Sequence, residues 1–424
     1  MKKFKNYLLL MFVFVVFCAQ SSSVLAKEVE FDFYYQCIEE VVQINDPEPE
    51  GWWGHTKSFL KSGLNLAKKT WEKGITRNFA PGEGTKRWYS DNKNIAYDVK
   101  RVKVTSEEHL LQLMGASSEA DLSDGQKALL AVYRHSRSED VKDRMKYNYR
   151  SKINVILSDT AGFDDPAKYP DIKDDFWPYS SGSTIQMSSN RYNYPGSDVS
   201  AASTFVHEFA HSYDRTIKEF RDPYGKDGSH FANELTKPRS AFVEGWAEFN
   251  QMLDSESKIR EMHNNCKLIR IESKTKAGEY TNVDPQELTG TDLLKVECIN
   301  AVIMHRMATE IDNGRDKVFK AFVDTRLLLF RDLKTMTKKF AKDNPADIAI
   351  LGKIIDEQTL GKLSDDEMSK YIGSSAEAKA FLEERAAAKN AAIEAPAVSQ
   401  VEGTVGQPLD IKVKTETSNP FSVR

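Results

Sequence analysis

The sequence predicts an α+β fold in which a small mixed sheet precedes one long helix, with helical regions flanking this unit at both ends. Three segments have the alternating or apolar character of strands, at residues 97–104, 152–158 and 181–189. A helical stretch from about residue 124 to residue 150 separates the first two. A long apolar helix follows the third strand, which is expected at the sheet edge, and this order of elements is typical of an α+β unit.

Residues 1–26 have the composition of a signal peptide. A basic start, Met1–Asn6, is followed by the uncharged apolar run Tyr7–Ala19, and the small side chains Val24 and Ala26 precede the expected cleavage point. The 13 residues of the apolar run would span roughly 20 Å as a helix, short of the ~30 Å hydrocarbon core of a bilayer. We therefore expect a cleaved signal and an exported protein, periplasmic or secreted, with no stable membrane span.

The mature chain is expected to be mildly acidic. Cleavage after residue 26 removes three of the 59 basic side chains and none of the 63 acidic ones, which leaves a net charge of −7. This balance argues against a nucleic-acid partner and against binding to anionic lipid. Three cysteines remain, Cys37, Cys266 and Cys298, which permit one disulfide, and Cys266–Cys298 is the pair we expect.

The stretch FVHEFAHSY, Phe205–Tyr213, contains two histidines separated by one helical turn. On a helix His207 and His211 project from one face, close enough for two ring nitrogens to reach one zinc ion at roughly 2.0–2.1 Å. Glu208 lies beside His207 and points away from the ligand axis, where a carboxylate can act as a base toward water. The pattern His-Glu-x-x-His therefore predicts a metal site with an adjacent general base.

The alternative is an ordinary solvated helix in which the motif arises by chance. Apolar residues surround most of this helix and predict that it is buried; they are Val199, Ala202, Phe205, Val206, Phe209, Ala210, Tyr213 and Ile217. Two histidines and a glutamate in a buried helix are costly unless they are paired or bind metal. A metal ion accounts for them, whereas a surface helix does not.

A second segment, AFVEGWAEFN, supplies two glutamates with the same one-turn spacing. A catalytic zinc site needs three protein ligands, so Glu244 or Glu248 can complete the set, and spacing alone does not choose between them. Gly245 inside this helix costs about 1 kcal/mol relative to alanine, which predicts close packing on another backbone. Asp214, seven residues after His207, lies on the ligand face of the first helix and is expected to support the ligands.

HEFAH followed by EGWAE resembles the gluzincin metallopeptidases, zincins in which a later helix carries a glutamate ligand. The likeness covers the two motif segments, and the first also resembles that of the lethal-factor-like peptidases. It implies one zinc ion bound by His207, His211 and Glu244, with Glu208 as the general base. Glu248 would then accept a hydrogen bond from a ligand histidine and fix its tautomer.

The resemblance does not identify the residue that stabilises the transition state. Lys237 stands where the lethal-factor-like peptidases carry a tyrosine. Candidates for this role are Tyr192, Tyr194, Tyr213, Tyr224, His230 and His263. The chain has no G-A-M-E-N exopeptidase signature, so the resemblance favours an endopeptidase.

These patterns divide the chain into five segments. The signal peptide, residues 1–26, is followed by an N-terminal helical region at 27–94 and a zincin-like catalytic domain at 95–266. A C-terminal helical domain occupies 267–389. Residues 390–424 are expected to form a flexible tail, because they are rich in Ala, Pro, Ser, Thr, Val and Gly.

The favoured function is an exported zinc metallopeptidase, an endopeptidase that hydrolyses a peptide or protein substrate. If the strand at 181–189 borders the cleft, it could bind extended substrate by strand addition. Two other classes stay open: a zinc hydrolase of a non-peptide amide, and an exported binding or assembly protein with a structural or idle zinc site. Glu208 favours an enzyme, because a purely structural site needs no base.

Overall fold

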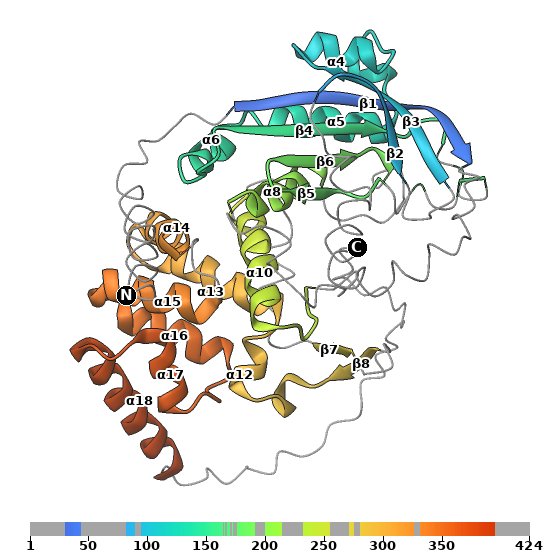
Figure 1. The fold of residues 1–424 in the computed structure, drawn as a ribbon. Helices are drawn as coiled ribbons and strands as arrows, with labels where there is room; N and C mark the ends of the chain where they lie inside the picture. The colour runs from blue at the N-terminus through green and yellow to red at the C-terminus, as the bar shows by residue number, and fades with distance from the viewer. Residues whose placement is uncertain are drawn as a thin grey trace, which may run out of the picture. The chain divides into compact units, whose positions relative to one another are not determined.

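The computed structural model describes twelve stretches of the chain, which form two compact units, Met1–Ser197 and Asp198–Arg424 (Figure 1). The described residues are 30–43, 82–89, 95–163, 165, 168–169, 172, 176–190, 200–213, 232–254, 271–274, 280–325 and 331–394. The expected signal peptide and most of the expected tail lie outside them. The boundary between the two units falls inside the expected 95–266 domain. That domain combines the sheet strands with helix α8, whereas the structure assigns them to different units.

The first unit is built on a mixed six-stranded sheet, in the order β2-β3-β1-β4-β6-β5. Its strands are β1 (Glu30–Gln43), β2 (Gly84–Tyr89), β3 (Ile95–Lys103), β4 (Lys152–Asp159), β5 (Tyr179–Ser181) and β6 (Thr184–Ser188). Strand β1 runs antiparallel to β3 and parallel to β4, and β4 runs parallel to β6. The α+β class and the strands expected at 97–104 and 152–158 are confirmed.

The prediction of a helical region at 27–94 is wrong for the residues that the structure describes there. β1 is a central strand of the sheet, and β2 pairs antiparallel with β3. In EFDFYYQCIEEVVQ the aromatic side chains Phe33, Tyr34 and Tyr35 are all buried, so both faces of β1 are covered. A strand covered on both faces has an aromatic and apolar sequence without clear alternation, so the two-residue period of β1 could not be recognised. The helical stripe around residue 64 lies outside the described residues.

The strand expected at 181–189 exists as β6, but it is not the edge of the sheet. β6 lies between β4 and the three-residue strand β5, and all five of its residues are buried. The connection is a tight turn at Gly182, whose φ of 62° favours glycine. Because β5 already pairs with Thr184–Gln186, this part of β6 is closed to strand addition by a substrate.

Helices α4 (Glu107–Leu113), α5 (Asp124–His135) and α6 (Glu139–Met145), with the short turn η1 (Glu119–Asp121), complete the described part of this unit. The helical stretch expected at 124–150 is therefore two helices. Ser138 separates them, because its side chain accepts the N–H of Val141 and starts α6. α5 packs on β4, and its Tyr133 lies edge-on to Phe33 at 5.0 Å between ring centroids.

The second unit is helical apart from one hairpin, within the residues described. Two helices carry the candidate site, α8 (Ala201–His211) and α10 (Pro238–Met252). The hairpin comprises β7 (Ile271–Lys274) and β8 (Tyr280–Val283), which the sequence did not predict. The remaining elements are η4 (Pro285–Glu287), α12 (Gly290–Leu293), α13 (Glu297–Glu310), α14 (Gly314–Thr325), α15 (Leu333–Asp343), η5 (Pro345–Asp347), α16 (Ile348–Gln358), α17 (Asp365–Ile372) and α18 (Ala376–Glu394). In the described ranges none of the helices combines the length and apolar composition that a bilayer span requires.

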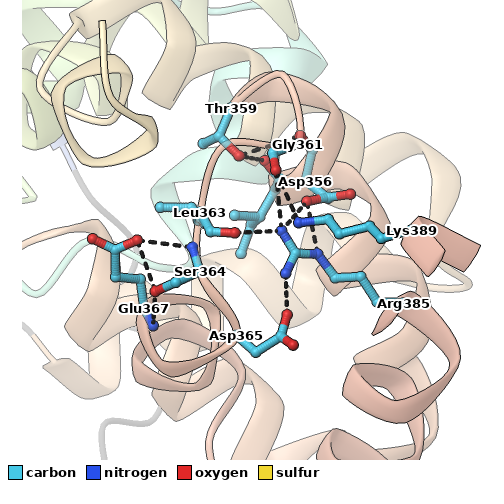
Figure 2. Close-up of polar contacts among 10 residues, drawn as sticks. Asp356, Thr359, Gly361, Leu363, Ser364, Asp365, Glu367, Arg385 and Lys389 are labelled. Carbon is cyan, nitrogen blue, oxygen red and sulfur yellow. Dashed lines mark hydrogen bonds and ion pairs between the residues drawn. The ribbon is translucent and has the colours of Figure 1, made fainter. Parts of the chain in front are cut away.

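Helix α18 continues to Glu394, so the start of the flexible tail expected at residue 390 is wrong by several residues. Arg385 ties this helix to the connection between α16 and α17 (Figure 2). Its guanidinium donates to Asp356 at 2.7 Å and to the Leu363 carbonyl at 2.6 Å, and it also pairs with Asp365. Figure 2 shows these groups converging on one buried arginine, which holds α18 against the helices before it.

The core of the second unit is aromatic and centres on Trp246 of α10. Its ring stacks on Phe322 of α14 at 3.5 Å between centroids, and Phe319 lies edge-on at 5.0 Å. The close packing predicted for Gly245 is confirmed. A Cβ there would lie 2.7 Å from the Cβ of Asn300 and 2.8 Å from the carbonyl oxygen of Glu297, both on α13. α10 therefore packs directly on α13, and this contact fixes how α10 is rotated about its own axis.

One described cysteine of the second unit, Cys298 on α13, is disulfide-bonded. Cys266 lies outside the described residues, so the Cys266–Cys298 pairing stays a prediction. In the first unit Cys37 is a free thiol in β1, and partial burial raises its pKa.

Candidate metal centre

The candidate site is formed by two adjacent helices of the second unit, α8 and α10. α8 begins at Ser200, whose side chain accepts the N–H of Ser203 at 3.1 Å. Ser200 is therefore the N-cap of this helix. Phe205 and Phe209 are buried on α8, as its apolar pattern predicts. With these apolar side chains buried, the two histidines lie on the polar face of α8, which points toward Glu244 of α10.

The three expected ligands lie together. Glu244 Oε2 is 3.2 Å from His211 Nε2 and 3.4 Å from His207 Nε2. The two imidazole rings are 4.9 Å apart between centroids and nearly perpendicular, at 78°. Each histidine side chain is 13% exposed and that of Glu244 is 22% exposed, so the donor atoms are partly open to solvent. Within the described part of the chain, this is the one group of His, Cys, Asp or Glu donors arranged to hold a metal ion.

These distances suit a tetrahedral zinc site. With bonds of 2.0–2.1 Å, two ligand atoms on a tetrahedral edge are about 3.3–3.4 Å apart. The Glu244–His211 and Glu244–His207 separations, 3.2 and 3.4 Å, are close to that edge length. Two imidazole nitrogens and one carboxylate oxygen are also the donor set of a catalytic zinc that keeps one position for another ligand. The residues present therefore fit zinc in donor type and in the two separations from Glu244.

The charge around the histidines also favours a cation. Burial lowers the pKa of His207, but the hydrogen bond that its protonated ring donates to Glu244 and the charges of Glu248 and Glu208 raise it, and the result is a pKa of about 9. Three carboxylates thus act on one imidazole. In the metal-free protein a proton on His207 balances part of this negative charge. A divalent cation at the same place would do so more fully.

Glu208, the expected base, is buried on α8 next to His207. Among the candidates for transition-state stabilisation only Tyr213 is described. Its ring lies in the aromatic core, 5.3 Å from that of Phe209 and 6.0 Å from that of Trp246. The other candidates and Asp214 lie outside the described residues.

The hydrogen bond expected between Glu248 and a ligand histidine is wrong for His207. Glu248 Oε1 lies 3.9 Å from His207 Nδ1, which is beyond hydrogen-bond range. Gln251 Oε1 lies 3.1 Å from the same nitrogen. Gln251 was not among the predicted site residues, although it follows Glu244 by seven residues and therefore shares its helical face.

No protein-family model, no curated protein and no solved structure matches this chain. The chemistry of these side chains is therefore what indicates a function.

Proposed function

We propose that this chain is a zinc-dependent endopeptidase whose metal is held by His207, His211 and Glu244. The observation that supports it most is the position of Glu244. One carboxylate oxygen from α10 lies 3.2 and 3.4 Å from the Nε2 atoms of two histidines on α8. The His-Glu-x-x-His spacing and the later glutamate, which resemble gluzincins, favour peptide hydrolysis over other zinc chemistry.

Zinc bound there would polarise a scissile carbonyl and lower the pKa of water to about 7. Glu208 would accept the proton of the attacking water and deliver it to the leaving amine. Because Glu208 and the two histidines belong to one helix, the geometry of that helix sets the spacing between the base and these two ligands. Glu244 would neutralise one charge of the metal, and its partial exposure leaves room for substrate beside it.

The architecture and the location of the protein belong to the same proposal. A zincin-like unit requires a small mixed sheet in the chain before the helix with the motif, and a second helix with the third ligand after it. The order of the sheet strands, α8 and α10 along the chain supports this part of the proposal. Export to a periplasm or to the medium rests on the composition of residues 1–26.

Metal analysis and a base substitution test the proposal on the chain that begins at residue 27. We expect about one zinc per chain and chelator-sensitive cleavage of casein. His207→Ala should abolish stoichiometric zinc binding. Glu208→Gln should keep zinc and lose turnover by several orders of magnitude, because it removes proton transfer and no ligand. The matched control is Glu139→Gln, at an exposed glutamate of α6, which should change neither zinc binding nor turnover.

Two results would contradict the proposal: wild-type protein without zinc after reconstitution, or Glu208→Gln with most of the wild-type turnover. A peptidoglycan preparation assayed in parallel separates the substrate classes. Zinc-dependent release of whole stem peptides from the peptidoglycan sugar, without cleavage of casein, would favour a hydrolase of non-peptide amides instead.

A further inference from the structure

A buried amide joins the ring of His207 to the first turn of its own helix. Gln251 Oε1 lies 3.1 Å from His207 Nδ1. The other end of the amide, Nε2, donates to the carbonyl oxygen of Ser203 at 3.1 Å and to its hydroxyl at 3.2 Å. Only 1% of Gln251 is exposed, so water does not replace these bonds when they are lost.

The Ser203 carbonyl decides which way the amide points. A carbonyl oxygen can only accept, so the NH2 group of Gln251 must face it and Oε1 must face His207. Because Oε1 can also only accept, His207 Nδ1 must carry a hydrogen. A neutral imidazole with its hydrogen on Nδ1 has its lone pair on Nε2. Nε2 is the atom that faces Glu244, at 3.4 Å.

The same amide sets the alignment of the two helices. Its contacts pair Ser203 with Gln251, while His211 pairs with Glu244, so α8 and α10 run in opposite directions. Glu244 and Gln251 are seven residues apart and share one face of α10. A slip by one turn, about 5.4 Å, would separate both pairs at once.

We infer that Gln251 is the positioning residue of the metal centre. It holds His207 with the hydrogen on Nδ1 and keeps Glu244 opposite the two Nε2 atoms. Glu248, 3.9 Å from His207 Nδ1, is too far away to take this role. The inference rests on the proposed zinc function. Removing such a partner of a ligand histidine costs about 10–100-fold in metal affinity.

Zinc competition titrations on three variants test it. Gln251→Met keeps the length of the side chain and removes the acceptor, and should weaken zinc binding about 10–100-fold. Gln251→Glu keeps an oxygen opposite Nδ1 but loses the donor to the Ser203 carbonyl, so it should weaken zinc binding less than Gln251→Met does. Gln358→Met, a buried glutamine at the end of α16, is the matched control and should leave zinc affinity unchanged.

Nuclear magnetic resonance of protein loaded with cadmium-113 reads the tautomer itself. We expect the metal to couple to Nε2 of His207, and a slowly exchanging hydrogen on Nδ1. The Nδ1 hydrogen should exchange rapidly in Gln251→Met and slowly in Gln251→Glu. A role in stability alone would lower the melting temperature of Gln251→Met without changing the exchange of this hydrogen.

The outcomes separate the inference from the proposed function. Wild-type protein that binds no zinc overturns both. If wild type binds zinc, equal affinity in Gln251→Met overturns the inference alone, and so does a Gln251→Glu variant as weak as Gln251→Met. Should Gln251→Met fail to fold, the wild type still decides, because coupling of the metal to Nδ1 of His207 contradicts the assigned tautomer.

Discussion

Replacing Gly245 by alanine tests how closely α10 must approach α13. In an ordinary helix interior this change stabilises the helix by about 1 kcal/mol, because alanine has a higher helix propensity than glycine. Here the new Cβ would lie 2.7 Å from Asn300 Cβ and 2.8 Å from the Glu297 carbonyl oxygen, whereas ordinary contacts are 3.4–4 Å. The two helices must therefore separate by several tenths of an ångström.

The cost of this separation exceeds the gain in helix propensity. Overpacking a core costs typically 1–3 kcal/mol, and the obstacle beside Gly245 is another helix's backbone and Cβ, which cannot turn aside. Because that obstacle cannot move, the upper part of this range applies, about 2–3 kcal/mol, and with the gain of about 1 kcal/mol subtracted we expect a net loss of roughly 1–2 kcal/mol. For a unit of this size the melting temperature should fall by roughly 2–8 °C.

Gly352→Ala is the matched comparison for a thermal unfolding assay. Its Cβ would also be crowded, at 2.5 Å, but the three nearest atoms all belong to the ring of the partly exposed Phe381, which can rotate away. We expect Gly352→Ala to lower the melting temperature less than Gly245→Ala does. The reasoning is refuted if Gly245→Ala is as stable as wild type, or if Gly352→Ala is the more destabilising of the two.

Two further predictions concern the metal centre. Glu244→Ala deletes a ligand atom and should weaken zinc binding far more than Glu248→Ala does. Glu248→Ala removes a charge 3.9 Å from His207 but no hydrogen bond to its Nδ1, so its effect should be smaller than that of Gln251→Met. If Glu248→Ala alone releases zinc in a competition titration, the ligand assignment is inverted. The pKa of His207 is raised to about 9 in the metal-free protein, so below that pH zinc must displace a proton from this ring. The affinity for zinc should therefore rise about tenfold per pH unit up to about pH 9 and then level off. A zinc affinity that does not change between about pH 7 and 9 in the same titration would contradict this.

Much of the fold followed from local patterns. The strands β3 and β4 and the helices that carry the two motifs were predicted because a period of two or of 3.6 residues is a property of the segment itself. β1 was not predicted because its consecutive side chains Phe33, Tyr34 and Tyr35 are buried on both faces, so this part of its sequence shows no polar side. The edge position of β5 depends on which strand pairs with β6, which no local pattern records.

The sequence by itself determined which side chains share a helical face. His207 and His211 lie one turn apart on α8, and Glu244, Glu248 and Gln251 form one stripe on α10, because the geometry of an α-helix is the same everywhere.

Only the tertiary structure decided which member of one stripe meets which member of the other. Sliding α10 by one turn would place Glu248 where Glu244 lies, with no change in any local spacing. The alignment is set by contacts between residues far apart in the chain, Gly245 against α13 and Gln251 against Ser203. Glu244 therefore faces both histidines because packing and buried hydrogen bonds hold the helices in one register, which spacing along the chain cannot specify.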